Sequence, residues 1–354
     1  MRLRVKIVSA VLAISVSLLA LEALVRILLY VGLADLSPSV RRERDWRAVH
    51  RTADQILTRE RYSFDEFSRT LGWQPKPNLR TQAITTNSQG LRGTREYDVQ
   101  APTGVRRILC IGDSFIFGEN LTDEETLPAQ LEKALSRTGR WEVLNLGVHG
   151  YGTDQQWLRL QELGFQYKAD VVVLGVFEDG LQRNILSFRD YAKPYFELVG
   201  RNLVVRSSPV PSPQELLSHP LRSPECQFQS WCALQWPIEK MLMSFPTMPD
   251  LEYTQAGKVT LALLDTISEE SRRQGMTLVL MAIPRRLRPE PTKVEAMLLR
   301  WAARTRTPMI NLRQEFLKFS AAQQKALYAG HWTAYGAAVA ANLAAHDISK
   351  ILHD

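Results

Sequence analysis

The chain has 354 residues, 45% of them hydrophobic, which is enough for one large domain or for one domain with accessory segments. Its formal net charge is +7, and its densest basic group directly follows the apolar N-terminus: Arg41, Arg42, Arg44, Arg47 and Arg51. That position favours lipid headgroups over nucleic acid as the neighbour of these arginines. No zinc-finger, Walker A or dinucleotide-binding signature is present, so we expect no nucleic-acid partner, no metal and no cofactor.

The N-terminus predicts a membrane-spanning helix. After a basic start, Ile7–Leu21 carries no charge, and the apolar character continues to Ala34 apart from Glu22 and Arg26. The uncharged run is too short to cross a bilayer core of about 30 Å, but it becomes long enough when it extends to about residue 31. Glu22 and Arg26 are four residues apart, so in a helix they share one face and can pair.

We favour an uncleaved anchor formed by residues 1–34 over a cleaved signal peptide. The apolar region is long for a signal peptide, and Gly32-Leu33-Ala34 is only a weak cleavage site. A short basic N-terminal tail usually stays in the cytoplasm, which predicts a single-pass protein whose main domain is periplasmic or extracellular. The arginines on the other flank keep a cytoplasm-facing enzyme as an alternative.

Residues 35–104 predict a juxtamembrane stalk followed by a small region of short strands and turns. Residues 35–60 are charged and compatible with a helix. Residues 61–104 contain Gly72-Trp73, Asn87-Ser88 and Gly90-Leu91 and have no helical periodicity.

Residues 105–354 alternate short apolar strands with longer amphipathic helices, which predicts an α/β domain with a parallel sheet covered on both faces. The expected strands are Arg107–Ile111, Glu142–Leu146, Val171–Val176, Thr277–Ile283 and Pro308–Leu312. The expected helices are Glu125–Arg137, Thr153–Gly164, Gly257–Gln274, Thr292–Thr305 and Ala334–Leu352.

An insertion at 185–255 separates the third and fourth of these strands. It begins with a predicted hairpin, Tyr195–Val199 and Leu203–Val205, and continues with a proline-rich stretch. A long irregular insertion is often a functional lid, and a surface loop packed by its own side chains is the alternative. Cys226 and Cys232 lie in this stretch, where they form a disulfide or remain two thiols, whereas Cys110 is expected in the core. Oxidation of this pair would argue against the cytoplasm-facing alternative.

Four motifs follow in order, each at or near the end of a predicted strand or the start of a predicted helix. They are Gly112-Asp113-Ser114, Asn145-Leu-Gly147-Val-His149-Gly150-Tyr-Gly-Thr153, Gly175-Val-Phe-Glu178-Asp179-Gly180 and Gly330-His331-Trp-Thr-Ala-Tyr-Gly336. The carboxyl ends of parallel strands are where α/β proteins place their ligands and chemistry. Any one motif is weak, because Gly-Asp-Ser is also a common turn, but the ordered set is specific.

This ordered set resembles the SGNH (GDSL) hydrolase superfamily over roughly residues 70–350. The likeness is closer to membrane-anchored bacterial members associated with the acylation of cell-surface carbohydrate. It is carried by Gly112–Gly118, Asp123-Glu-Glu-Thr126, Gly150-Tyr-Gly-Thr-Asp154 and Lys193-Pro-Tyr-Phe196. The resemblance implies a flavodoxin-like, three-layer, doubly wound parallel sheet.

The resemblance also assigns roles to these residues. Ser114 is the expected nucleophile and His331 the base that removes its proton. The backbone N–H groups of Ser114 and Gly150 are expected to form an oxyanion hole, and the missing Cβ of Gly150 lets the substrate come close. His149 either lines the substrate pocket or is a plain loop residue.

Two positions depart from the family pattern. Where the family has an oxyanion-hole asparagine, this chain has Asp179, which can join the oxyanion hole as a donor only if it is protonated. Otherwise Asn184, five residues on and also a possible pocket residue, or backbone groups replace the donor, or turnover is weak. Where the family has an aspartate that orients the histidine, this chain has Ala329 and Tyr328. A Ser-His dyad can still work, with a backbone carbonyl or the Tyr328 hydroxyl holding the ring, but more slowly than a full triad.

The expected function is therefore that of an esterase or O-acyltransferase acting on O-acyl, above all O-acetyl, groups of an extracytoplasmic glycan through an acyl-Ser114 intermediate. The alternative is a catalytically degenerate module that binds glycan or scaffolds an envelope complex. The expected partners are the acylated glycan or another ester, the membrane through the N-terminal helix, and polysaccharide-biosynthesis proteins of the envelope.

Overall fold

The computed structural model describes residues 2–30, 64–187, 189, 191–218, 228, 230–231 and 251–352. These residues divide into two compact units. The N-terminal unit comprises the described residues within 1–58, 187–192 and 211–248, and the sheet unit comprises those within 59–186, 193–210 and 249–354.

The sheet unit is built on five parallel strands. Their order is β4 (Trp141–Asn145), β3 (Arg106–Ile111), β5 (Val171–Phe177), β8 (Thr277–Ile283) and β9 (Met309–Asn311). Numbered along the chain this order is 2-1-3-4-5, the flavodoxin-like arrangement, which confirms the expected fold class. The strands begin and end within two residues of the predicted positions.

Alternation of side chains along each strand divides the interior into two cores. In β3, Leu109 and Ile111 join one core, while Ile108 and Cys110 join the other. Both sets are fully buried, which is the condition of a strand covered on both faces. Cys110 is thus a core residue, and burial raises the pKa of its thiol.

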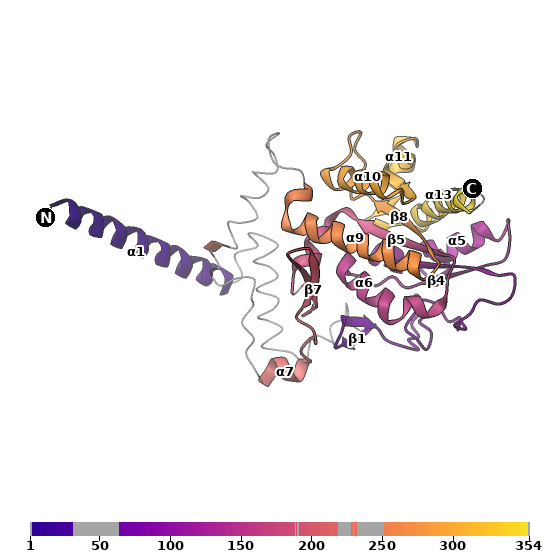
Figure 1. Ribbon diagram of the computed structural model, residues 1–354, viewed down its shortest axis with the longest axis horizontal. Helices are drawn as coiled ribbons and strands as arrows, with labels where there is room; N and C mark the ends of the chain where they lie inside the picture. Colours follow the sequence, from indigo (N-terminus) through magenta and orange to yellow (C-terminus); the bar gives the residue numbers. More distant parts are fainter. Residues whose placement is uncertain are drawn as a thin grey trace. The chain divides into compact units, whose positions relative to one another are not determined.

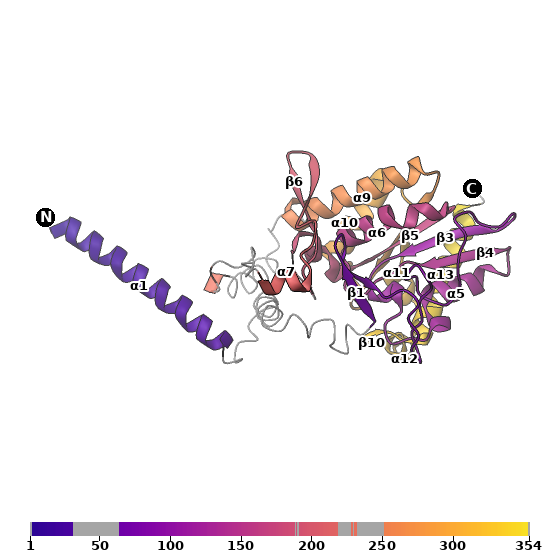
Figure 2. The same ribbon diagram turned by 90° about the horizontal axis from the view of Figure 1, so that it is seen from below.

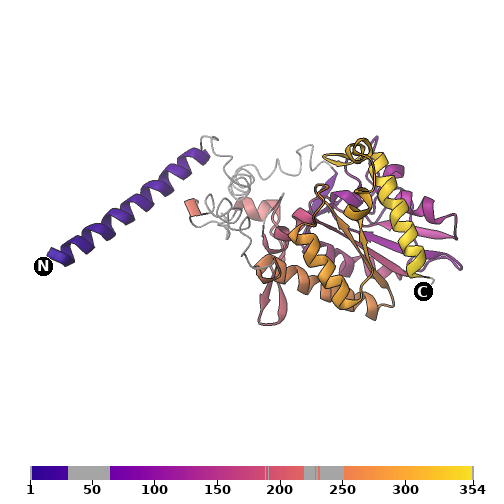
Figure 3. The ribbon, with the colours of Figure 1, turned by 90° about the horizontal axis from the view of Figure 1, so that it is seen from above.

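Helices cover both faces of the sheet (Figures 1 and 2). The first core contains side chains of α6 (Thr153–Glu162), α9 (Gln255–Arg273) and α10 (Lys293–Thr305). The second contains side chains of α5 (Leu127–Leu135), α11 (Leu312–Phe316) and α13 (Ala334–Ile351). Figure 3 shows α9 in orange and α13 in yellow from above. Four of these helices start at a threonine whose hydroxyl accepts a backbone N–H of the first turn: Thr126, Thr254, Thr292 and Thr333.

Smaller elements complete the sheet unit. Residues 64–104 contain an antiparallel hairpin, β1 (Asp65–Ser68) and β2 (Gly72–Pro75), and pack in the same unit as the sheet. The other short elements are α4 (Ser114–Phe117), η2 (Asp123–Glu125), η3 (Gly164–Tyr167), η4 (Glu178–Ile185), η5 (Leu251–Tyr253), α12 (Ala321–Ala326), β10 (Tyr328–Ala329) and β11 (His331–Trp332). The predicted insertion hairpin is present as β6 (Tyr195–Val199) and β7 (Asn202–Arg206).

The N-terminal unit contains α1 (Arg2–Tyr30) and α7 (Pro213–Ser218). Within the described part of the chain, Val5–Leu28 is the one helical stretch long and apolar enough to cross a membrane. The Arg26 Nε donates to Glu22 Oε1 over 2.7 Å, which confirms the predicted pair. Gly32-Leu33-Ala34, the stalk at 35–60, and Cys226 and Cys232 lie outside the described residues.

Candidate active site

The turn after β3 presents Ser114 at the carboxyl edge of the sheet. Asp113 caps the short helix α4, because its Oδ1 accepts the Phe115 N–H over 3.1 Å. Gly118 ends the helix with φ 83°, and its N–H donates to the Ser114 carbonyl over 3.0 Å. A glycine suits this left-handed conformation, so the chain reverses within one helical turn of the serine.

Ser114 meets His331, which lies 217 residues further along the chain. The Ser114 Oγ is 2.8 Å from His331 Nε2, a hydrogen bond of the length expected for a nucleophile and its base. His331 stands on β11, just after the Gly330 turn of the β10–β11 hairpin. The Phe115 ring, next to the serine, packs against the imidazole with the ring centroids 5.1 Å apart. The structure therefore brings together the two residues expected to carry the chemistry.

The carboxylate nearest to His331 in the described part of the chain is Glu119. Its Oε2 lies 3.6 Å from His331 Nε2, on the same nitrogen that faces the serine. Glu119 reaches this place because its N–H donates to the Ser114 carbonyl as the chain turns at the end of α4. The Tyr328 hydroxyl does not hold the imidazole, since it donates to the Pro284 carbonyl over 3.3 Å. Burial raises the pKa of the Tyr328 hydroxyl.

The second motif lies beside the serine turn. The Val148 N–H donates to the Gly112 carbonyl over 3.1 Å, and the Tyr151 N–H closes a turn onto the Val148 carbonyl. Gly150 occupies the third position of this turn with φ 81°, a conformation that favours glycine. Among the described residues, the N–H groups of Ser114 and Gly150 donate to no acceptor, as an oxyanion hole requires.

The structure places Asp179 away from the expected oxyanion role. Its Oδ2 pairs with Arg285 Nη1 over 3.0 Å, and both side chains are exposed. The residue before it, Glu178, turns inward instead and accepts the Arg285 N–H and the Thr292 hydroxyl. Burial raises the pKa of the Glu178 carboxyl. A 3₁₀-helix begins directly after β5, so neighbouring side chains point in different directions, which strand spacing alone does not reveal.

Asn184 and His149 also serve the scaffold rather than a pocket. The Asn184 amide accepts the Asp154 N–H over 3.1 Å and donates to the Thr260 hydroxyl over 2.8 Å. His149 is buried, with its Nε2 2.8 Å from Asp65 Oδ2 on β1. Burial raises the pKa of Asp65. The side chain of His149 therefore ties the second motif to the β1–β2 hairpin.

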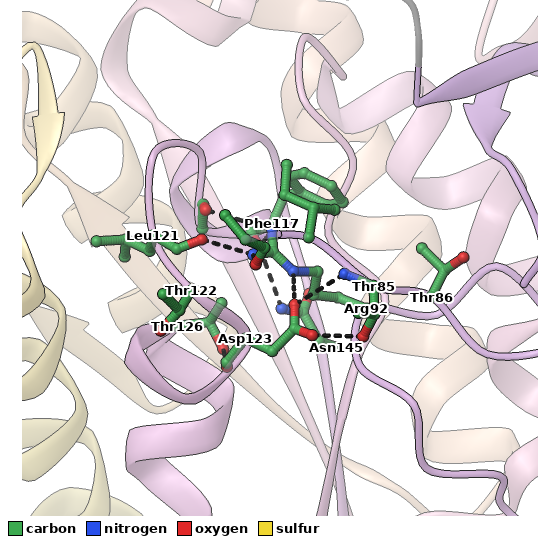
Figure 4. Close-up of polar contacts among 12 residues, drawn as sticks. Thr85, Thr86, Arg92, Phe117, Leu121, Thr122, Asp123, Thr126 and Asn145 are labelled. Atoms are coloured by element: carbon green, nitrogen blue, oxygen red, sulfur yellow. Dashed lines mark hydrogen bonds and ion pairs between the residues drawn. The ribbon is translucent and has the colours of Figure 1, made fainter. Parts of the chain in front are cut away.

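Sequence reasoning missed Arg92, which holds the far end of α4. Its buried guanidinium pairs with Asp123 and donates to the carbonyls of Phe117, over 3.2 Å, and Leu121, over 2.6 Å (Figure 4). Burial lowers the pKa of Arg92. The only signal in the sequence is an arginine in a turn-rich segment, which is the usual composition of a solvated surface.

Among the described residues, no group of three or more histidine, cysteine or acidic side chains is arranged to bind a metal ion. The chemistry available is that of a serine hydroxyl, an imidazole and backbone donors. These are the groups that acyl-transfer reactions use.

No protein-family model and no curated protein matches the chain. The chain is similar to solved structures of lipases and esterases. One is the lipase/acylhydrolase from Enterococcus faecalis, 14% identical with a TM-score of 0.42, covering 70% of this chain and 96% of that one. Another is the esterase EstA from Pseudoalteromonas sp., 15% identical with a TM-score of 0.41, covering 70% of this chain and 100% of that one.

A third is a protein from Desulfitobacterium hafniense described as lipolytic and of the G-D-S-L family, 12% identical with a TM-score of 0.37, covering 68% and 98% of the two chains. The resemblance to a family rests on features of the chain itself. A serine turn after β3, an interior strand, meets a histidine that returns just before the last helix, on a sheet of order 2-1-3-4-5. In this architecture and its ordered motifs, the chain resembles the SGNH (GDSL) hydrolase superfamily.

Proposed function

We propose that the chain is a membrane-anchored serine esterase or O-acyltransferase that acts on O-acyl, above all O-acetyl, esters of an extracytoplasmic glycan. The observation that supports this most is the hydrogen bond of 2.8 Å between Ser114 Oγ and His331 Nε2. A serine hydroxyl becomes a nucleophile when a base at this distance removes its proton.

The reaction would run in two steps. In the first, His331 takes the Ser114 proton, Oγ attacks the ester carbonyl, and the imidazolium returns the proton to the leaving sugar oxygen. In the second, water or a sugar hydroxyl gives its proton to His331 and attacks the acyl-Ser114 ester, and the imidazolium returns that proton to the departing Ser114 Oγ, which releases the acid or a new ester. Both outcomes use the same residues, so the acceptor alone decides between hydrolase and transferase.

Charge at the site is consistent with this sequence of steps. The oxyanion that forms in each step would be stabilised by the N–H groups of Ser114 and Gly150, a contribution typically worth about 3 kcal/mol per donor. The imidazolium would be stabilised by Glu119, whose carboxylate is 3.6 Å from Nε2. This carboxylate approaches the serine side of the ring, unlike the aspartate of a triad, which bonds the other nitrogen.

The membrane and the glycan belong to the same proposal. The apolar helix Val5–Leu28 supports an anchor, with the periplasm or the extracellular space as the expected place of the sheet unit. The glycan rests on the likeness of the motifs Asp123–Thr126, Gly150–Asp154 and Lys193–Phe196 to the membrane-anchored members of the superfamily. Polysaccharide-biosynthesis proteins of the envelope are the corresponding partners.

A second candidate is a catalytically silent module that binds glycan. Two observations favour it: within the described residues, His331 Nδ1 has no hydrogen-bond partner, and no asparagine side chain joins the two backbone donors. A base without an orienting partner is a weaker catalyst than a triad histidine.

The deciding experiment compares the full chain in detergent with Ser114→Ala, His331→Ala and the control Ser136→Ala, a serine on the surface turn after α5. We expect ester turnover and fluorophosphonate labelling in the wild type and in Ser136→Ala, and a loss of at least about 10³-fold in the other two. An acetylated oligosaccharide mixed with an unacetylated acceptor then separates free acetate from transferred acetate. Equal rates in all four proteins would overturn the proposal, and a folded wild type that is neither active nor labelled would favour the silent module.

A further inference from the structure

We propose that Arg183 is a positioning residue for the reaction of Ser114. Its side chain joins the two backbone segments that carry the oxyanion donors and neutralises the carboxylate beside the nucleophile. This inference rests on the proposed function. It also explains how the site works without the asparagine that the superfamily usually places after the third strand.

A single nitrogen of Arg183 contacts both segments. Its Nη1 donates to Asp113 Oδ2 over 3.0 Å and to the Tyr151 carbonyl over 2.8 Å. Asp113 directly precedes Ser114, and Tyr151 directly follows Gly150. The guanidinium therefore fixes the distance between the two peptide segments whose N–H groups have to converge on one oxygen. Preorganised donors of this kind are effective because they need no rearrangement when charge develops.

The charge of Arg183 also matters. The Asp113 carboxylate is buried next to the nucleophile, where an unpaired negative charge would oppose the developing oxyanion. Paired with Arg183, the two side chains carry no net charge. The pair thus removes a repulsion that the reaction would otherwise have to overcome in a poorly solvated place.

Arg183 is itself held from behind by a fully buried network. Its carbonyl accepts from the Lys193 ammonium over 2.9 Å, and the same ammonium pairs with Asp154. The neighbouring Asn184 joins the network through the Asp154 N–H and Thr260. Asp154 and Lys193 belong to the motifs that carry the likeness to the membrane-anchored members of the superfamily, and this network gives those motifs a shared role. They fix η4 so that Arg183 reaches the serine turn.

The contacts of Arg183 differ from those of a structural arginine. Arg107 is fully buried, and all three of its guanidinium nitrogens donate to Glu142 or to backbone carbonyls. In Arg183, Nε and Nη2 have no acceptor among the described residues, and the side chain is 12% exposed. Its bonds are concentrated on the two segments that matter for the reaction.

The experiment compares Arg183→Met and Arg183→Lys with Arg304→Met in the full chain, since Arg304 also pairs with an aspartate, Asp265, but on exposed helix surfaces. We expect Arg183→Met to lower kcat about 100-fold with KM changed less than about threefold, because the contact acts on the transition state. The kcat of Arg183→Lys should lie between those of the wild type and Arg183→Met, since an ammonium keeps the charge but cannot reproduce the guanidinium geometry. Arg304→Met should match the wild type.

Two further measurements distinguish positioning from general support of the fold. In the first, added guanidinium chloride at millimolar concentration should restore the activity of Arg183→Ala about tenfold. In the second, Asp113→Asn should partly rescue Arg183→Met, because the unpaired carboxylate is gone and asparagine still caps α4. No gain in either would overturn the charge argument.

Hydrogen exchange of the peptides that cover residues 147–153 gives a readout that does not depend on turnover. These amides should exchange faster in Arg183→Met than in the wild type or in Arg304→Met, at equal melting temperature. Unchanged exchange together with wild-type kcat would overturn the inference while leaving the proposed function intact. Activity that survives in Ser114→Ala would instead overturn the proposed function.

Discussion

Two aspartate–arginine pairs lie after neighbouring strands at the carboxyl edge of the sheet, and both have an Nη1–Oδ2 distance of 3.0 Å. In the first pair, Asp113 is 1% and Arg183 12% exposed. In the second, Asp179 is 44% and Arg285 57% exposed. The equal distances hide different energetics, because water screens the second pair and leaves the first almost unscreened. The two pairs therefore differ in burial and in the other hydrogen bonds of the arginine, and not in distance. By these two criteria Asp113–Arg183 organises the site, whereas Asp179–Arg285 is an exposed surface pair.

The largest effect is expected at the buried end of the Arg183 network. Lys193→Met leaves Asp154 fully buried without its cation, which should cost about 3–5 kcal/mol of unfolding free energy. Chemical denaturation of the purified protein measures this loss. In Lys193→Met/Asp154→Asn much of it should return, because the uncompensated charge is removed. A Lys193→Met protein as stable as the wild type would mean that burial does not separate the two pairs as described.

A smaller effect is expected at Glu119, whose contact with His331 is partly exposed and longer. Glu119→Gln should lower kcat/KM about tenfold, because it removes the charge that stabilises the imidazolium. This effect lies between the effects expected from substitutions in the buried and the exposed aspartate–arginine pair. Steady-state kinetics on the same ester measures it, with the neighbouring surface change Glu124→Gln as the control. A loss as large as that of Arg183→Met would show that partial exposure does not weaken charges at this site.

The buried carboxyl of Glu178 should make the stability of the protein depend on pH. Burial raises its pKa above the ordinary 4.5, so the folded chain keeps this proton at pH values where the unfolded chain has lost it. Stability from this carboxyl therefore falls as pH rises from 4.5 through the raised folded pKa. Glu178→Gln lacks this pH-dependent contribution to the unfolding free energy. The unfolding free energy of the wild type relative to the variant should therefore decrease as pH rises from 4.5 through the raised pKa, and chemical denaturation at several pH values measures this. A constant difference would contradict the sign.

The smallest effect is expected at the exposed pair. Arg285→Met should change the unfolding free energy by less than about 1 kcal/mol, and added salt should reduce the difference further. Thermal unfolding at low and high ionic strength measures both. A larger, salt-independent loss would place Arg285 in the same class as Arg183.

The sequence predicts the sheet and points to Ser114 and His331, which the structure brings together, because these positions carry local signals. Strand residues such as Ile108 to Ile111 are apolar without interruption, and Ser114 and His331 follow glycines at element boundaries. The supporting residues depend on contacts between distant segments. Arg183 reaches Asp113 across 70 residues, and His149 contacts Asp65 on β1, far away in the sequence, so neither partner is visible from spacing. Asp179 was the expected donor by spacing alone, and the 3₁₀-helix after β5 turned it outward.

The buried guanidinium of Arg92 has a consequence for how such a site can be moved between proteins. The arginine comes from residues 64–104, before the α/β pattern begins, yet it holds the carbonyls at the end of the serine helix. A designer who transplanted the five strands and their motifs onto another scaffold, starting at residue 105, would carry over Ser114 and His331 without Arg92, whose hydrogen bonds hold the end of α4. The segment that has to be transferred with the serine turn is therefore longer than the recognisable fold.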